Sequence, residues 1–298
     1  MILVTGGTGF IGTRVVHALR AEDRPVRVLA RDPKDAETVA AWGCQVAEGD
    51  MTDAASLRRA VAGCDAVIDL VAIISGSRED FQRVMIQGTR DLVAAAKDAG
   101  VKRFVLMSAL GVSERTRTLT PYFEAKWDME QTVQRSGLEY VIFRPSFVFG
   151  RDGGVLATFV RVARWAPVTP IVGPGTERIQ PIWADDVGAY FAAGVDATDA
   201  ANRTFEIGGP DVVTWDEFWQ RLKRTLRVRR PSLHLPYRLM NAQAAVTERL
   251  PGAPVSRDQL KMLAAGDNVV SNTDAVETFG LPLVPLDEQL RRAAAKND

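Results

Sequence analysis

The chain opens with the stretch Ile2-Leu3-Val4-Thr5-Gly6-Gly7-Thr8-Gly9-Phe10-Ile11-Gly12, and this stretch decides the fold. Its apolar start predicts a short buried strand, and the amphipathic pattern from Gly9 to about Ala21 predicts a helix. Between them Gly6 permits a tight turn, Gly9 lets backbone N–H groups approach a pyrophosphate, and Gly12 lets the helix pack closely on the strand. The helix then turns its positive amino end toward the phosphates. We therefore predict a dinucleotide site with contacts from Gly6, Thr8, Gly9, Phe10, Ile11 and Gly12.

The rest of the amino-terminal half alternates short apolar runs with helical patterns. Such alternation is typical of a parallel sheet that helices cover on both faces. We expect an α/β fold with a doubly wound (Rossmann) sheet, whose ligand crevice lies at the carboxyl ends of the strands. Further strands are predicted at 26–29, 45–47, 66–71, 103–107 and 140–143, and helices at 53–62, 79–99 and 122–136.

The pattern changes after about residue 150, where four prolines between 167 and 181 interrupt an irregular apolar stretch. One more strand is predicted at 204–207, and from Thr214 onward the chain is mostly helical and irregular. We therefore expect two parts. The first is a cofactor-binding Rossmann core of residues 1–150, to which 178–208 return, and the second is a smaller, mostly helical lobe of residues 151–177 and 209–298.

Composition narrows the class of protein. The 37 Lys and Arg residues balance 37 Asp and Glu, so no overall field attracts nucleic acid or an anionic membrane. The chain has two cysteines, Cys44 and Cys64. We expect both to be small buried residues of a reduced cytoplasmic protein. The first strand starts at residue 2 and leaves no room for a signal peptide, and no apolar run reaches the roughly 18–20 residues of a membrane span. We also expect no metal site, because no Cys, His and Asp cluster has ligand spacing.

The end of the second predicted strand discriminates between dinucleotides. An acidic residue there holds the ribose 2′-hydroxyl of NAD(H), whereas an arginine accommodates the 2′-phosphate of NADP(H). Ala30 takes the acidic position, and Arg31 follows it with a guanidinium suited to bidentate phosphate contact. Asp32 keeps NAD(H) open as the alternative, since a shift of one residue would bring its carboxylate to the 2′-hydroxyl. We favour NADP(H) as the cofactor.

Further motifs follow the glycine turn in a fixed order. Their order and spacing resemble the extended and atypical short-chain dehydrogenase/reductase superfamily, with its epimerase/dehydratase-like members, over nearly the whole chain. The motifs are the TGxxGxxG turn Thr5–Gly12, Gly49-Asp50-Met51, Leu70-Val71-Ala72-Ile73, Ser108, the YxxxK motif Tyr122–Lys126, the RPxxVxG loop Arg144–Gly150, Pro181–Val187 and Ile207-Gly208-Gly209-Pro210.

The resemblance implies roles for these residues. Lys126 would hold the nicotinamide ribose, Ser108 would donate a hydrogen bond to the substrate oxygen, and Tyr122 would act as general acid or base. Tyr122 and Lys126 lie one helical turn apart, and a neighbouring ammonium is expected to lower the pKa of the phenol. The cofactor contacts implied by the resemblance are Asp50 and Met51 at the adenine, Val71 and Ala72 behind the cofactor, and Pro145 and Phe147 beside the nicotinamide.

Within the superfamily, Ser108-Ala109-Leu110-Gly111 followed closely by Tyr122 is similar to bacterial relatives of the NADPH-binding accessory subunit of respiratory complex I. Two departures from the superfamily pattern oppose catalysis. Met85 stands where an Asn often organises a proton path, and it cannot hydrogen-bond a water in that way. Ala109 follows Ser108 where many extended members have a second serine.

Three functions stay open on this evidence. The first is an NADP-dependent oxidoreductase of a small apolar carbonyl or alcohol, because the apolar segment Trp165–Pro174 would border the substrate crevice in the resembling fold. Ordinary packing between lobes is the other interpretation of that segment. The second is a non-catalytic NADPH-binding scaffold or assembly protein, and the third is a nucleotide-sugar epimerase or dehydratase.

The run Arg221–Arg230 carries six positive charges in ten residues. It would suit an acidic protein partner, a phosphorylated substrate or an anionic lipid surface, the last implying peripheral membrane association. A solvated helix face is the alternative. No aromatic residue interleaves the charges, so we expect no nucleic-acid partner.

Overall fold

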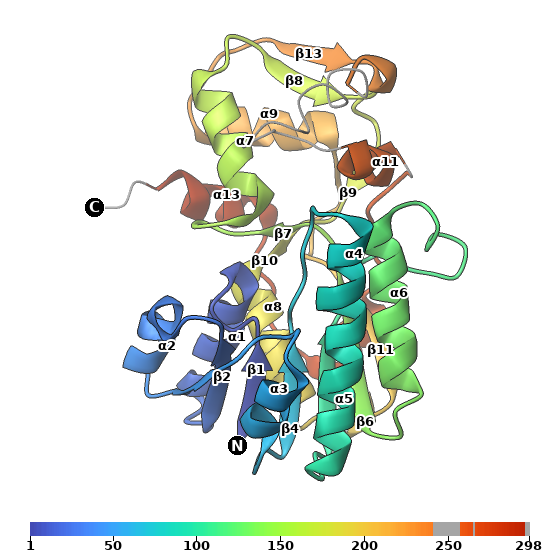
Figure 1. Ribbon diagram of the computed structural model, residues 1–298. Helices are drawn as coiled ribbons and strands as arrows, with labels where there is room; N and C mark the ends of the chain where they lie inside the picture. The colour runs from blue at the N-terminus through green and yellow to red at the C-terminus, as the bar shows by residue number, and fades with distance from the viewer. Residues whose placement is uncertain (241–256, 265, 296–298) are drawn as a thin grey trace. The chain divides into compact units, whose positions relative to one another are not determined.

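The computed structural model describes residues 1–240, 257–264 and 266–295. Seven strands form one parallel sheet in the order β11-β6-β5-β4-β1-β2-β3 (Figure 1). Strand order reverses at β1, which pairs with β2 on one side and β4 on the other. The expected doubly wound α/β fold is confirmed. The strands are β1 Ile2–Thr5, β2 Val26–Ala30, β3 Gln45–Glu48, β4 Ala66–Asp69, β5 Arg103–Met107, β6 Glu139–Pro145 and β11 Arg203–Ile207.

Helices cover both faces of this sheet because successive strand residues point to opposite sides. Leu3, Phe104 and Ile142 pack with α3, α5 and α6 in one apolar cluster. Phe143 instead meets Tyr190 and Phe191 of α8, which packs on α1. The helices are α1 Phe10–Ala21, α2 Glu37–Ala41, α3 Ala54–Val61, α4 Arg78–Asp80, α5 Gly88–Asp98, α6 Pro121–Gln134, α8 Ala184–Gly194 and α12 Thr273–Phe279.

Two local features differ from the sequence predictions. A short 3-10 helix, η1 Pro33–Ala36, and then α2 occupy a stretch where no helix was expected. Asp32 initiates η1, since its side chain accepts a 2.9 Å hydrogen bond from the Lys34 N–H. The predicted helix 79–99 is present, but its Phe81–Gln87 portion (η2) is a π-helix between α4 and α5.

Contacts divide the chain into two units. The first comprises Met1–Pro145, Ala184–Ile207 and Ser271–Pro282, and the second comprises Ser146–Trp183, Gly208–Val270 and Leu283–Asp298. Residues 146–150 and 178–183, expected with the sheet, belong to the second unit because β7 Val148–Phe149 pairs with β10 Ile182–Trp183. Residues 271–282, expected in the smaller lobe, belong to the first, where Phe279 of α12 packs on Phe143 and Phe205.

The second unit has its own aromatic core. Phe159 of α7 makes edge-on contacts with Phe218 and Trp219 of α9, and Phe149 closes the cluster. Its helices are α7 Gly154–Trp165, α9 Trp215–Thr225, α11 Arg257–Ala264 and α13 Leu286–Ala294. Its remaining strands pair β8 Thr169–Val172 with β13 Ser232–Leu235 in parallel and β9 Arg178–Ile179 with β12 Val213–Thr214 in antiparallel.

Two expectations from composition bear on the fold. Cys44 and Cys64 are buried and form no disulfide, as expected. None of the helices in the described part of the chain has the length and apolar character that crossing a membrane requires.

Candidate functional site

The turn between β1 and α1 is packed so closely that it leaves no room for a side chain at Gly12. Gly6 has a φ of +69°, and its carbonyl accepts a 3.0 Å hydrogen bond from the Gly9 N–H. A Cβ at Gly12 would overlap the Gly6 carbonyl oxygen and lie 2.7 Å from the Gly7 Cα. Gly9 caps α1 with no side-chain hydrogen bond, so the first N–H groups of the helix keep their donors for a ligand. This cradle fits a pyrophosphate.

The other predicted site residues of the first unit lie at the same edge of the sheet. Because the strands are parallel, residues that follow their carboxyl ends share the edge where ligands bind to such sheets. These residues are Gly6 and Thr8 after β1, Arg31 after β2, Asp50 and Met51 after β3, Val71 and Ala72 after β4, Ser108 after β5, and Pro145 at the end of β6. The predicted site residue Phe147 instead lies in the second unit, where its N–H donates to the Asn268 Oδ1 at 3.2 Å.

The residues after β2 and β3 form a charged group. Asp32 uses its carboxylate to cap η1, whereas the neighbouring Arg31 is exposed. Burial opposes ionisation of Asp50, but hydrogen bonds from Thr52 and the charges of Arg31 and Arg83 hold the pKa of this carboxyl below its ordinary value. Arg83, on η2, was not among the predicted site residues. A lone arginine on a helix gave no signal that it faces the end of β3.

Ser108 presents a buried hydroxyl. The residue is 2% exposed, and its N–H donates to the Phe143 carbonyl at 2.8 Å. Among the described residues, no atom hydrogen-bonds the Ser108 Oγ. Buried hydroxyls without a partner are rare, and such a group at the carboxyl edge of the sheet suits the oxygen of a ligand.

Tyr122 and Lys126 lie one turn apart on α6, as predicted, but their electrostatics differ from expectation. The fully buried Lys126 donates a 2.6 Å hydrogen bond from Nζ to the Met107 carbonyl. Burial lowers the pKa of Lys126 to about 8, although the charges of Asp69 and Glu130 oppose that shift. Burial also raises the pKa of Tyr122 to about 12. The predicted lowering of the phenol pKa is therefore wrong, since the ammonium is directed at a carbonyl and the phenol is desolvated.

Two buried carboxyl groups, those of Asp69 and Glu130, interact electrostatically with Lys126. Asp69, fully buried at the end of β4, accepts hydrogen bonds from Thr5 Oγ1 at 2.7 Å and Thr89 Oγ1 at 3.0 Å. Burial raises the pKa of Asp69. Glu130 is also fully buried, and Arg144 binds both of its oxygens, at 2.8 and 2.6 Å. The motifs did not indicate a role for Asp69 or Glu130, although an aspartate inside the apolar run 66–71 was a signal of a buried polar group.

Met85 lies on η2 with its side chain fully buried in the apolar cluster of the first unit. The thioether therefore faces other apolar side chains. It provides no polar group for a water-linked proton path at this position.

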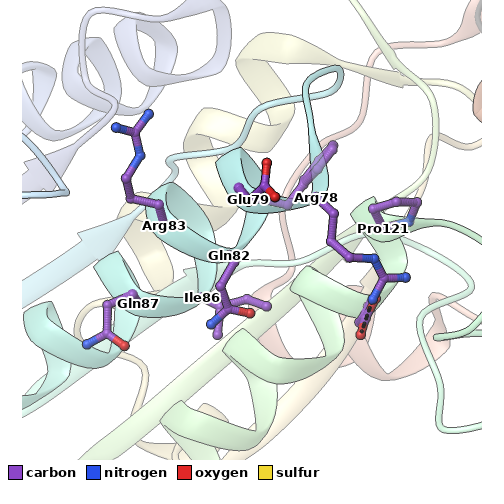
Figure 2. Close-up of a pocket in the computed structure, with 9 residues that line it drawn as sticks. Arg78, Glu79, Gln82, Arg83, Ile86, Gln87 and Pro121 are labelled. Atoms are coloured by element: carbon purple, nitrogen blue, oxygen red, sulfur yellow. Dashed lines mark hydrogen bonds and ion pairs between the residues drawn. The ribbon is translucent and has the colours of Figure 1, made fainter.

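A surface pocket of about 520 Å³ lies beside η2 and the start of α6. Figure 2 shows Arg78 and Arg83 pointing in opposite directions, with Arg78 in a 2.9 Å ion pair with Glu124. None of the predicted site residues lines this pocket. The described residues that line it are Arg78, Glu79, Phe81, Gln82, Arg83, Ile86, Gln87, Pro121 and Glu124. Across the described residues, no group of three or more His, Cys, Asp and Glu is placed to hold a metal ion.

The parallel sheet, the glycine cradle and the residues at the strand ends define a dinucleotide-binding protein of the short-chain dehydrogenase/reductase type. The chain belongs to the NAD(P)H-binding family, whose profile matches residues 6–160. The resemblance drawn from the motifs is thereby confirmed.

Known proteins extend this similarity over most of the chain. The NAD(P)H azoreductase of Xenophilus azovorans is 28% identical over 93% of this chain and 91% of its own length. Subunit 9 of the NADH dehydrogenase (ubiquinone) 1 alpha subcomplex of Mus musculus is 31% identical over 70% of this chain and 56% of its own length. The NADPH-dependent quinone oxidoreductase QOR2 of Escherichia coli, solved with NADPH, shares the fold with a TM-score of 0.79 and 21% identity over 97% of this chain and 98% of its own.

Proposed function

We propose that the chain is an NADPH-dependent reductase of a small, apolar, electron-poor acceptor such as a carbonyl or quinone-like compound. The observation that carries the proposal is the buried Ser108 hydroxyl, which has no partner among the described residues and follows β5 at the edge that also holds the glycine cradle. The similarity to an azoreductase and the fold of a quinone oxidoreductase support a reductase of this kind.

Residues of this edge would hold NADP(H). The N–H groups at the start of α1 would bind the pyrophosphate, and Arg31 would bind the 2′-phosphate. Because the Asp32 carboxylate already caps η1, it is less available to a ribose 2′-hydroxyl. Asp50 and Met51 would meet the adenine, Val71 and Ala72 would lie behind the cofactor, and Pro145 and Phe147 would lie beside the nicotinamide.

The cofactor, when bound, supplies a hydride. The protein then has to donate a proton and stabilise charge on the acceptor oxygen. With a pKa of about 12, Tyr122 stays protonated at neutral pH and suits the role of general acid. Ser108 would donate a hydrogen bond to the same oxygen, and the Lys126 ammonium would hold the ribose. Protonated Tyr122 favours reduction over alcohol oxidation, which needs a base.

A non-catalytic NADPH-binding scaffold is the second candidate. Met85 favours it, since its buried thioether replaces the polar residue that a proton path would use. The similarity to subunit 9 of the mouse complex, which covers 70% of this chain, also favours it.

One experiment separates these functions. The purified protein is tested for retained nucleotide, and NADPH oxidation is then followed with a panel of quinones, azo compounds and apolar carbonyls. We expect turnover that falls 10²- to 10⁴-fold, as is typical for loss of a general acid, in Tyr122→Phe. Tyr140→Phe, the same change at the amino end of β6, is the matched control.

The outcomes of this experiment discriminate between the reductase and the scaffold. Turnover that Tyr122→Phe leaves unchanged contradicts the general-acid assignment. Tight NADPH binding with no turnover on any member of the panel supports the scaffold instead.

A further inference from the structure

The end of α9 and the segment that follows it carry three arginines that form no ion pair with a carboxylate of any described residue. Within the basic run, Arg221 pairs with Asp211 and Asp287, each at 3.6 Å. Lys223 instead donates to the neutral oxygens of the Arg230 carbonyl at 3.0 Å and Ser232 at 2.7 Å. The side chains of Arg224, Arg227 and Arg229 are exposed and form no ion pair with any described residue. The run is therefore more than a helix face with balanced charges.

An exposed tryptophan, Trp165, lies beside Arg230 at the end of the basic run. Trp165 ends α7 with 77% of its surface exposed, the largest exposed fraction among the large apolar side chains that the structure describes. The basic segment is fixed beside it, because Arg230 donates to the Trp165 and Ala166 carbonyls and the Thr169 N–H donates to the Pro231 carbonyl at 2.9 Å. Val168, which precedes β8, and Leu233, near the start of the paired strand β13, are 36% and 50% exposed.

The backbone of Arg227 gives a third observation. Arg227 follows the C-cap of α9 with a φ of +57°, a position and conformation at which helices usually place glycine. A side chain there brings a conformational cost that glycine avoids. The fold therefore does not require an arginine at this position, where glycine would suit the backbone better.

We propose that this surface, formed by Trp165, Val168, Arg224, Arg227, Arg229 and Leu233 and named here the cationic face, binds the headgroups of an anionic phospholipid bilayer. Guanidinium groups suit phosphate, and they are attracted to the negative potential of such a membrane. Tryptophan prefers the depth of the headgroups, where its ring is buried and its N–H stays hydrated. An acidic protein or a nucleic acid would use the charges, but it would not require the insertion of Trp165. All six residues belong to the second unit, so the proposal is independent of the redox chemistry.

Sedimentation with vesicles tests the charge. The full chain should bind vesicles of phosphatidylglycerol mixed with phosphatidylcholine, and should not bind phosphatidylcholine alone. Binding should weaken as salt is added. The double variant Arg227→Gln/Arg229→Gln should reduce partition roughly 10- to 30-fold, as expected for two cations near an anionic surface. Arg58→Gln/Arg59→Gln on α3, an exposed pair of equal charge in the first unit, is the matched control and should leave partition unchanged.

Fluorescence tests the insertion of Trp165. The other five tryptophans are buried or partly buried, so the blue shift and the quenching by brominated lipid should come from Trp165. Trp165→Ala should abolish both signals and weaken partition several-fold, whereas Val276→Ala on the exposed side of α12 should not. Arg227→Gly removes the charge without harming the fold, because glycine suits the left-handed backbone at this position. It should raise or preserve thermal stability and still weaken vesicle binding.

Three results would overturn the proposal. The first is no binding to phosphatidylglycerol vesicles at low ionic strength. The second is equal loss of binding in the α9 and α3 double variants, which would indicate non-specific charge. The third is a Trp165 fluorescence that stays unshifted and unquenched when vesicles bind, which would contradict the docking of this face on the bilayer.

Discussion

Lys126 and Tyr122 are neighbours on one helix face, yet the Lys126 Nζ lies 6.0 Å from the centre of the Tyr122 ring and donates to the Met107 carbonyl. The ammonium is thus held by backbone, and its burial lowers the pKa to about 8. Its charge is therefore lost within an accessible pH range.

NADPH affinity should fall as the pH rises through about 8, because neutral Lys126 loses the charge that would hold the ribose. Isothermal titration between pH 6.5 and 9.5 measures this change. In Lys126→Met the affinity should be low throughout and should lack this step. A wild-type affinity that is flat across the range would contradict the assigned role.

The stability of the cofactor-free protein should change in the opposite direction over an overlapping range. Between about pH 8 and the ordinary lysine pKa of 10.5, unfolded Lys126 binds more protons than the folded residue, so the free energy of unfolding rises with pH. The full contribution of this group is about 3 kcal/mol. Denaturant unfolding of wild type and Lys126→Met isolates it as a difference that grows above pH 8, and a constant difference would contradict the depressed pKa.

Arg31→Ala should weaken NADPH binding about 10- to 100-fold, as expected for loss of a charge-assisted contact, and leave NADH binding nearly unchanged. Asp32→Ala is the control, since this carboxylate caps η1 and its loss should affect local stability more than NADH affinity. Fluorescence titration with both nucleotides measures the ratio. Equal weakening of the two nucleotides by Arg31→Ala would refute the contact with the 2′-phosphate.

Two glycines of the turn should respond differently to alanine. A Cβ at Gly12 overlaps the Gly6 carbonyl oxygen, so Gly12→Ala should lower the free energy of unfolding by about 1–3 kcal/mol. At Gly9 the nearest atom would lie 3.2 Å away, so Gly9→Ala should fold and yet lose NADPH affinity, because a methyl group obstructs the approach of phosphate. Thermal unfolding measured beside nucleotide titration distinguishes the two effects. A folded Gly9→Ala variant with full affinity would argue against the cradle.

Glu130→Ala should destabilise the protein by about 3–5 kcal/mol, because it leaves the Arg144 guanidinium without its buried partner. The exposed pair Arg78–Glu124 offers a matched comparison, and Glu124→Ala should change stability by less than about 1 kcal/mol. Urea unfolding of both variants is the measurement. Similar small losses in the two would show that burial adds nothing to the Glu130 pair.

Local patterns were sufficient to predict much of the fold. Apolar runs such as 103–107 matched β5 residue for residue, and the glycine spacing placed the turn before α1. The same patterns misplaced the carboxyl-terminal segment 271–282, because its membership depends on Phe279 reaching an aromatic group formed by distant strands. Periodicity along one helix carries no information about such contacts.

Less of the candidate site than of the fold could be predicted from the sequence. Motif positions predicted which strand ends would carry Ser108 and Arg31. They did not predict the direction of the Tyr122 pKa, since desolvation depends on everything packed around the phenol. Nor did they indicate the hydrogen bonds from Thr5 and Thr89 to Asp69, which join three elements far apart in the chain.

The return of α12 to the sheet has a consequence for how the protein is made. Phe279 contacts Phe143, Tyr190 and Phe205, so it completes an aromatic group begun more than a hundred residues earlier. During synthesis the first unit can pair its strands early, but that face of the sheet keeps exposed rings until α12 leaves the ribosome. The nascent chain therefore carries an apolar surface that a chaperone can recognise, and this surface stays open until α12 has been made.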